Sequence, residues 1–141
     1  MQTEKGMEKG QLLEQTQEKV LSTTIKEITP FGVKLEINAE GPITGVLYVG
    51  KHTETGSLYL KNDGTVELEA KAIDTTKEGD ILVISFKGEG RINGNGTGSA
   101  EGKSFITTQS TRLAQLNNSF IRVEATVDFG TGDAGLKYYK L

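Results

Sequence analysis

Side chains that carry ordinary catalytic chemistry are scarce in this 141-residue chain, which has no cysteine and a single histidine, His52. Thiol nucleophiles, disulfides, and thiolate or multi-histidine metal sites are therefore excluded. A serine triad or a zinc hydrolase would depend wholly on His52. That residue lies in the polar stretch GKHTETG over 50–56, which is typical of a solvated connection between strands. Carboxylates are numerous, but no spacing singles out a pair, so we predict no catalytic residue and no metal site.

A glycine-rich stretch over 86–105 nearly matches two nucleotide-binding motifs. It runs GNGTGS over 94–99, whereas a dinucleotide fingerprint needs Gly-x-Gly-x-x-Gly. It ends in GKS over 102–104, but Thr97 stands where a P-loop requires its first glycine. Both motifs must open a helix that receives phosphate at its N-terminus, and no amphipathic helix follows. We therefore predict a bent hairpin and no nucleotide or other cofactor.

The register of this hairpin predicts which of its side chains face inward. A turn centred on either Asn-Gly step places Glu101, Lys103 and Phe105 on the face of Phe86, the more apolar face of its strand. Glu101 and Lys103 would then be polar groups inside the protein. A bulge that reverses the parity, or a position at the rim, would instead leave them in solvent.

A second hairpin near the end of the chain, with its turn at 130–133, predicts that Tyr138 faces inward. Its hydroxyl would then be available inside the protein. The predicted ligand-binding residues are Glu101, Lys103, Tyr138, Phe86 and Phe105.

Two-residue periodicity dominates the chain from residue 19 onward, with Gly, Pro, Asn and Asp turns between the alternating segments. We predict an all-β protein, a single antiparallel β-barrel of about eight strands, with a β-sandwich as the alternative. One short helical turn is expected near 110–117, capped by Ser110 or Thr111. The expected strands are 19–28, 31–39, 43–50, 56–61, 65–73, 80–92, 97–108, 119–129 and 134–141.

Residues 1–18 are polar and predict an N-terminal extension, which could be helical over 11–18; the barrel domain would span 19–141. The extension has no apolar run of the kind a secretory signal or a membrane span needs, so we expect a cytoplasmic protein.

Charge and apolar patterning bear on the partners of the protein. The net charge of −3 and the absence of a basic run argue against nucleic acid, and no membrane partner is expected. Residues 46–49 and 81–86 are apolar on both faces, so the helical turn with the N-terminal segment, or another subunit, must cover them. We therefore expect a homo-oligomer.

Three segments together resemble a group of small uncharacterised prokaryotic proteins built as allene oxide cyclase-like or calycin-like β-barrels. The segments are FITTQS over 105–110, LAQLN over 113–117 and GLKYY over 135–139. The resemblance covers roughly 19–141 and implies a barrel with a lumen, often oligomeric. Cyclases of that barrel class act mainly by shaping an apolar substrate, and no catalytic motif transfers residue by residue.

These observations favour a protein that binds a small, largely apolar ligand in the barrel lumen, in a cavity of roughly 300 Å³ or more. One alternative is a structural or oligomeric interaction module without a ligand. Another is a cyclase- or isomerase-like lumen enzyme. The sequence names neither a ligand nor a reaction.

Overall fold

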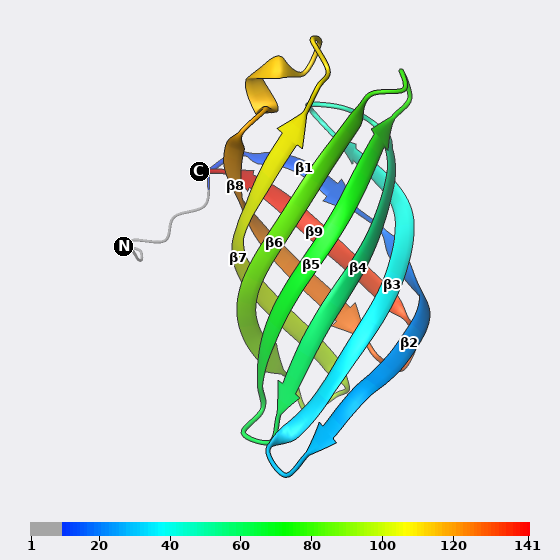
Figure 1. Cartoon of the computed structure of the whole chain (residues 1–141), viewed down its shortest axis with the longest axis vertical. Coiled ribbons are helices and arrows are strands. Elements are labelled where there is room, and N and C mark those ends of the chain that lie inside the picture. The colour runs from blue at the N-terminus through cyan, green and yellow to red at the C-terminus, as the bar shows by residue number, and fades with distance from the viewer. Residues whose placement is uncertain (1–9) are drawn as a thin grey trace.

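The protein is a closed antiparallel barrel of eight strands with one extra strand, seen in a computed structural model that describes residues 10–141 (Figure 1). Neighbouring strands pair in chain order from β2 to β9, and β9 returns to β1 and β2, which close the barrel against β3. This confirms the predicted barrel and rules out the sandwich. The strands are β1 (Leu12–Thr16), β2 (Glu18–Thr29), β3 (Gly32–Gly45), β4 (Gly50–Lys61), β5 (Thr65–Thr76), β6 (Ile81–Ile92), β7 (Thr97–Thr108), β8 (Ser119–Asp128) and β9 (Asp133–Lys140).

Burial alternates along β4, β5, β6, β7 and β8, because successive side chains of a strand point to opposite faces, whereas β2 is exposed along most of its length. In β6, Leu82, Ile84 and Phe86 lie in the core, while Ile81 and Val83 remain about half exposed on the outer surface. The other segment expected to be a doubly apolar strand, 46–49, is instead the connection between β3 and β4. Among residues 10–141, no helix is long and apolar enough to cross a membrane.

The N-terminal part of the chain departs from its prediction. Leu12–Thr16 form β1 between β3 and β9, and β2 begins at Glu18. A helix over 11–18 is therefore wrong, and the part of the predicted extension from residue 10 onward belongs to the barrel. The rest of that extension lies outside the described residues.

The glycine-rich hairpin has a different register from either predicted one. Phe86 pairs with Ser104, so the hairpin loop has an odd number of residues. The β7 residues predicted to face inward therefore face outward, and their neighbours face inward. The loop contains Gly96 at φ +81°, a left-handed conformation that favours glycine. A Cβ on Gly90 would lie 1.7 Å from the Ser99 carbonyl oxygen, so glycine here allows β7 to approach closely.

One end of the barrel carries the predicted helical turn, which is a single 3-10 turn, η1 (Ala114–Leu116) (Figure 1). The predicted cap at Ser110 or Thr111 is wrong, because Leu113 stands at the N-cap of η1 and no side chain caps the turn. Ser110 instead accepts a hydrogen bond from the Leu113 backbone N–H just before the turn. Leu113 and Leu116 are buried in the same apolar cluster as Tyr48 from the β3–β4 connection. This end of the lumen is therefore filled with apolar side chains.

Leu82→Ala and Lys87→Ala test the inner and outer faces of β6, because Leu82 is fully buried and Lys87 is exposed. Loss of the buried leucine should lower the free energy of unfolding by about 2–5 kcal/mol. The change at exposed Lys87 should cost less, within about 0.5 kcal/mol. Urea unfolding followed by circular dichroism measures both, and equal losses would contradict the assignment of faces.

Candidate functional site

A group of polar side chains lies inside the barrel, where most of the remaining inward positions are apolar. β1 and β2 contribute Glu14, Thr16 and Glu18, β4 contributes His52 and Glu54, and β5 contributes Asp74. All six are buried. They occupy alternate positions of their strands, so the pleat directs every one of them inward. The interior thus holds four carboxyl groups and one imidazole.

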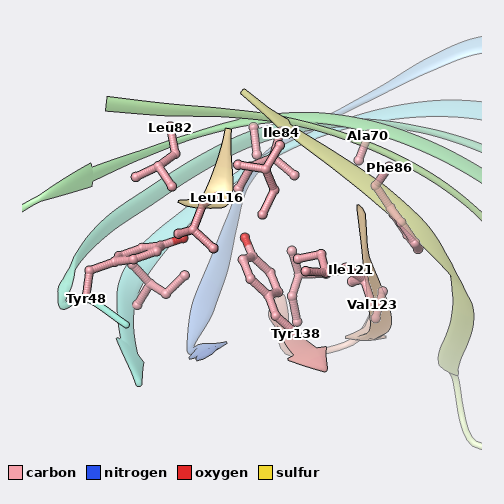
Figure 2. Close-up of a cluster of buried hydrophobic side chains, with 14 of the residues drawn as sticks. Tyr48, Ala70, Leu82, Ile84, Phe86, Leu116, Ile121, Val123 and Tyr138 are labelled. Atoms are coloured by element: carbon pink, nitrogen blue, oxygen red, sulfur yellow. The ribbon is translucent and has the colours of Figure 1, made fainter. Parts of the chain in front are cut away.

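His52 and Asp74 are direct cross-strand neighbours on β4 and β5. Nδ1 of His52 lies 2.5 Å from Oδ1 of Asp74, and both side chains are completely buried. The other Asp74 oxygen accepts hydrogen bonds from the hydroxyls of Tyr48 at 2.6 Å and Tyr138 at 3.2 Å. Figure 2 shows the two tyrosines directed toward each other within the apolar cluster. Asp74 is therefore held from three sides, and it fixes the orientation of the imidazole.

The second nitrogen of His52 faces a pair of glutamates. Nε2 lies 2.9 Å from Oε1 of Glu54 and 3.8 Å from Oε1 of Glu18. The Thr16 hydroxyl donates to Oε2 of Glu18 at 2.5 Å, but Oε1 of Glu18 is buried with no hydrogen-bond donor within reach. The two carboxyl groups thus face each other, and either a proton held by one of them or a cation must lie between them.

The pKa values of these groups follow from burial and from one another. Burial, then the neighbouring Glu54 carboxyl, raises the pKa of Glu18 to about 8. Burial alone would lower the pKa of His52, but hydrogen bonds to Asp74 and Glu54 outweigh it and raise the value to about 10. Burial acts to raise the pKa of Glu54, but its hydrogen bonds to His52 and Glu18 lower it overall. Near neutral pH the pair therefore shares one proton beside an imidazolium.

The chemistry available to this cluster is proton exchange or cation binding. Glu18, His52 and Glu54 each offer one ligand atom, and these atoms all lie within 4.8 Å of one another. No lysine or arginine is among the buried side chains of residues 10–141. The cluster is thus rich in acceptors, and its only built-in cation is His52.

An apolar cavity leads from this cluster to the end of the barrel opposite η1. Glu18 and Glu54 line its inner end, while Val66, Ile92 and Phe129 line it beside the hairpin turns. It has about 510 Å³ of atom-free space, its mouth included, of which about 40 Å³ admits the centre of a water molecule. The lumen is therefore open, but the prediction of a cavity of roughly 300 Å³ or more is wrong, because the comparable volume is only about 40 Å³.

The structure separates the predicted ligand-binding residues into two groups. Tyr138 and Phe86 face inward, as their register predicts. The inward orientation predicted for Glu101, Lys103 and Phe105 is wrong, because the odd-length loop reverses the parity of β7. Glu101 and Lys103 are exposed, and Glu101 pairs with Arg122 on the outer surface. Phe105 packs outside against Phe120, with ring centroids 5.0 Å apart.

The solvated position predicted for His52 is also wrong, since it is fully buried on β4. Sequence reasoning missed this strand because the side chains on both of its faces are polar there, so no apolar alternation is visible. A usable signal exists: His52 and Glu54 are two residues apart and are followed at the same parity by Gly56 and Leu58. Leu58 faces inward, and every second residue before it in the same strand, including Glu54 and His52, must face inward too.

Glu14→Gln tests the cost of a buried carboxylate in this interior. Oε2 of Glu14 accepts backbone N–H groups of Leu47 and Tyr48, but burial raises the pKa from 4.5 to about 7. The folded state then binds this proton more tightly than the unfolded state, so the contribution of Glu14 to stability is lost as pH rises from 4.5 to 7. Relative to wild type, the variant should gain on the order of 2 kcal/mol over that range.

Urea unfolding of both proteins at pH 4.5, 6 and 8 measures this difference. Glu89→Gln, at an exposed position of β6, is the matched control and should show a flat difference. A flat difference for Glu14→Gln as well would show that Glu14 is not desolvated as described.

Comparison with known proteins identifies the fold alone. No protein-family model and no curated protein matches the sequence. A Clostridium acetobutylicum protein of unknown function is similar in structure, with a TM-score of 0.80 at 16% identity over 92% of this chain and 94% of that one. A β-barrel-like protein from Acinetobacter baumannii gives 0.73 at 11% identity, covering 91% and 92%. An enzyme from Penicillium herquei gives 0.67 at 16% identity, covering 92% of each chain.

Proposed function

We propose that the protein binds a small, slender, largely apolar molecule in the barrel lumen, with one polar group of that molecule against Glu18 and Glu54. The observation that carries this proposal is the apolar cavity that ends on two buried carboxyl groups. Cavities of this kind, apolar along their walls with a few convergent polar groups, are the usual form of small-molecule sites. The width of the cavity favours a single alkyl chain over a ring system.

The charge of the inner end favours one class of polar group. Glu18, Glu54 and Asp74 surround one imidazole, so the wall offers hydrogen-bond acceptors and negative charge. An amine or an alcohol can donate to such a wall, whereas a carboxylate would be repelled. We therefore propose an aliphatic amine or alcohol as the ligand class.

The resemblance to allene oxide cyclase-like and calycin-like barrels supports a lumen site, because it implies a barrel with a usable interior. We also propose that the barrel is of that specific type and that the protein is cytoplasmic. A structural module without a ligand and a cyclase- or isomerase-like enzyme are the competing functions, and the binding experiment separates the first of them.

Titration of the EDTA-treated, ¹³C-methyl-labelled protein with n-hexylamine, n-hexanol and hexanoate tests the proposal by NMR. The amine and the alcohol should bind with dissociation constants on the order of millimolar, as expected for ligands of this size. They should shift the methyl signals of Leu58, Val66 and Ile92, which line the cavity. Hexanoate should bind at least about tenfold more weakly, because its charge opposes that of Glu54.

Ala100→Leu fills the cavity from β7 and should weaken amine binding about tenfold or more, since it occupies the space of the alkyl chain. Lys103→Leu places the same new side chain on the outer surface of the same strand and should leave binding unchanged. Failure of all three probes to bind at 10 mM, or equal binding by both variants, would support the structural module instead.

The predicted homo-oligomer remains a proposal, and the outer surface of β5, β6 and β8 is the face we assign to it. Ile73 and Val83 are cross-strand neighbours there, and Ile81 and Phe120 extend the exposed apolar surface. Native mass spectrometry should show an oligomer that Val83→Lys dissociates, because a lysine at the centre of an apolar contact must be desolvated. A wild-type monomer at 50 µM subunit concentration would contradict this prediction.

A further inference from the structure

We propose that Glu18, His52 and Glu54 form a binding site for one divalent transition-metal cation, with Zn²⁺ as the reference ion. This inference goes beyond the lumen-ligand proposal and does not depend on it. The sequence predicts no metal site, because it offers one histidine and no recognisable ligand spacing. The barrel creates the site by placing β2 and β4 on either side of β3, so that their inward side chains meet inside the barrel.

The distances among the three donor atoms suit a small cation. A tetrahedral ion with bonds of about 2.1 Å has ligand–ligand edges of roughly 3.4 Å. Nε2 of His52 lies 2.9 Å from Glu54 Oε1 and 3.8 Å from Glu18 Oε1, which bracket that edge. The two glutamate oxygens lie within 4.8 Å of each other, so small side-chain adjustments would complete the arrangement.

Oε1 of Glu18 is a second, independent observation. It is buried, no other group in the structure donates to it, and it lies 3.8 Å from Nε2 of His52. A cation bound here would replace the proton that Glu18 and Glu54 share. The other oxygen of the same carboxyl is held by Thr16. A buried acceptor oriented in this way is costly unless a proton or a cation satisfies it.

The environment of His52 is that of a metal ligand. Histidines that bind metals almost always donate the second ring N–H to a carboxylate, which fixes the ring and raises the basicity of the coordinating nitrogen. Nδ1 of His52 has such a partner in Asp74, and Tyr48 and Tyr138 hold Asp74 in turn. Nε2 is then the coordinating atom, and the proton that it holds against Glu54 is released to solvent when the cation binds.

The donor set indicates the class of cation, and the cavity supplies its remaining position. One imidazole nitrogen with two carboxylate oxygens suits Zn²⁺, Mn²⁺ or Fe²⁺, whereas Mg²⁺ and Ca²⁺ prefer oxygen alone. Glu18 and Glu54 line the cavity, so a fourth position would face its open space. A water molecule fits there.

The single histidine makes the decisive measurement simple. In full-length protein labelled with ¹⁵N-histidine and stripped with EDTA, all ring signals come from His52. One equivalent of Zn²⁺ should shift Nε2 strongly, while Nδ1 keeps its proton to Asp74. Isothermal titration calorimetry should give one Zn²⁺ per chain, and Mg²⁺ should not compete.

Three near-isosteric variants locate the ion. Glu18→Gln and Glu54→Gln each remove one ligand charge and should weaken Zn²⁺ binding by about 100-fold or more. Asp74→Asn, which acts through His52, should weaken it about 10–100-fold and alter the Nδ1 proton signal. Glu14→Gln is the matched control: it is equally buried and acidic but lies outside the ligand set, and should bind as wild type does.

Circular dichroism establishes that each variant is folded before titration, and Glu18→Gln alone suffices if the others unfold. An unshifted Nε2 signal at one equivalent of Zn²⁺ would overturn the proposal. Binding that Glu18→Gln leaves unchanged would also overturn it, because the ion would then lie elsewhere.

Discussion

The hydrogen bond between His52 and Asp74 is the interaction on which the interior of this barrel depends. The register of β4 against β5 makes them direct neighbours, and both are completely buried. Removing either partner would leave an unpaired charge in a dry interior, a loss of about 3–5 kcal/mol in comparable proteins. Tyr48, Tyr138 and the apolar residues around η1 are arranged about this pair, which explains why that end of the lumen is filled while the other is open.

Stability does not explain why the interior keeps these charges. Well-packed apolar residues of similar volume are often as stabilising as a buried ion pair, or more so. Glu18 adds a further cost, because one of its oxygens has no donor. Costs of this kind collect at sites that act on a ligand, an ion or a proton. The polar interior therefore supports a functional site, and the cavity that reaches it gives that site access to solvent.

The sequence predicts the barrel well because its strands alternate strongly and its turns are rich in glycine, asparagine and aspartate. It predicts the site poorly for two physical reasons. The inward face of β4 becomes polar at His52 and Glu54, so the usual contrast between an apolar and a polar face disappears. In the β6–β7 hairpin, an odd loop around Gly96 reverses the parity of β7. Because the register differs by one residue from the predicted one, Glu101 and Lys103 face the outer surface and not the lumen. Tyr138 lies in a hairpin whose parity was predicted correctly, and it faces inward.

Both proposed sites use Glu18 and Glu54 at the inner end of the cavity, but they favour lumen ligands of opposite charge. Without a cation, Glu18 and Glu54 present acceptors and negative charge, so the wall selects groups that donate hydrogen bonds. A divalent cation between them would offset both carboxylates and leave an electrophilic position facing the apolar channel. The same cavity would then accept a carboxylate or a carbonyl oxygen in place of an amine. If both proposals hold, the charge between the two glutamates would set which polar group the lumen accepts, and the apolar walls would favour an alkyl chain in both states.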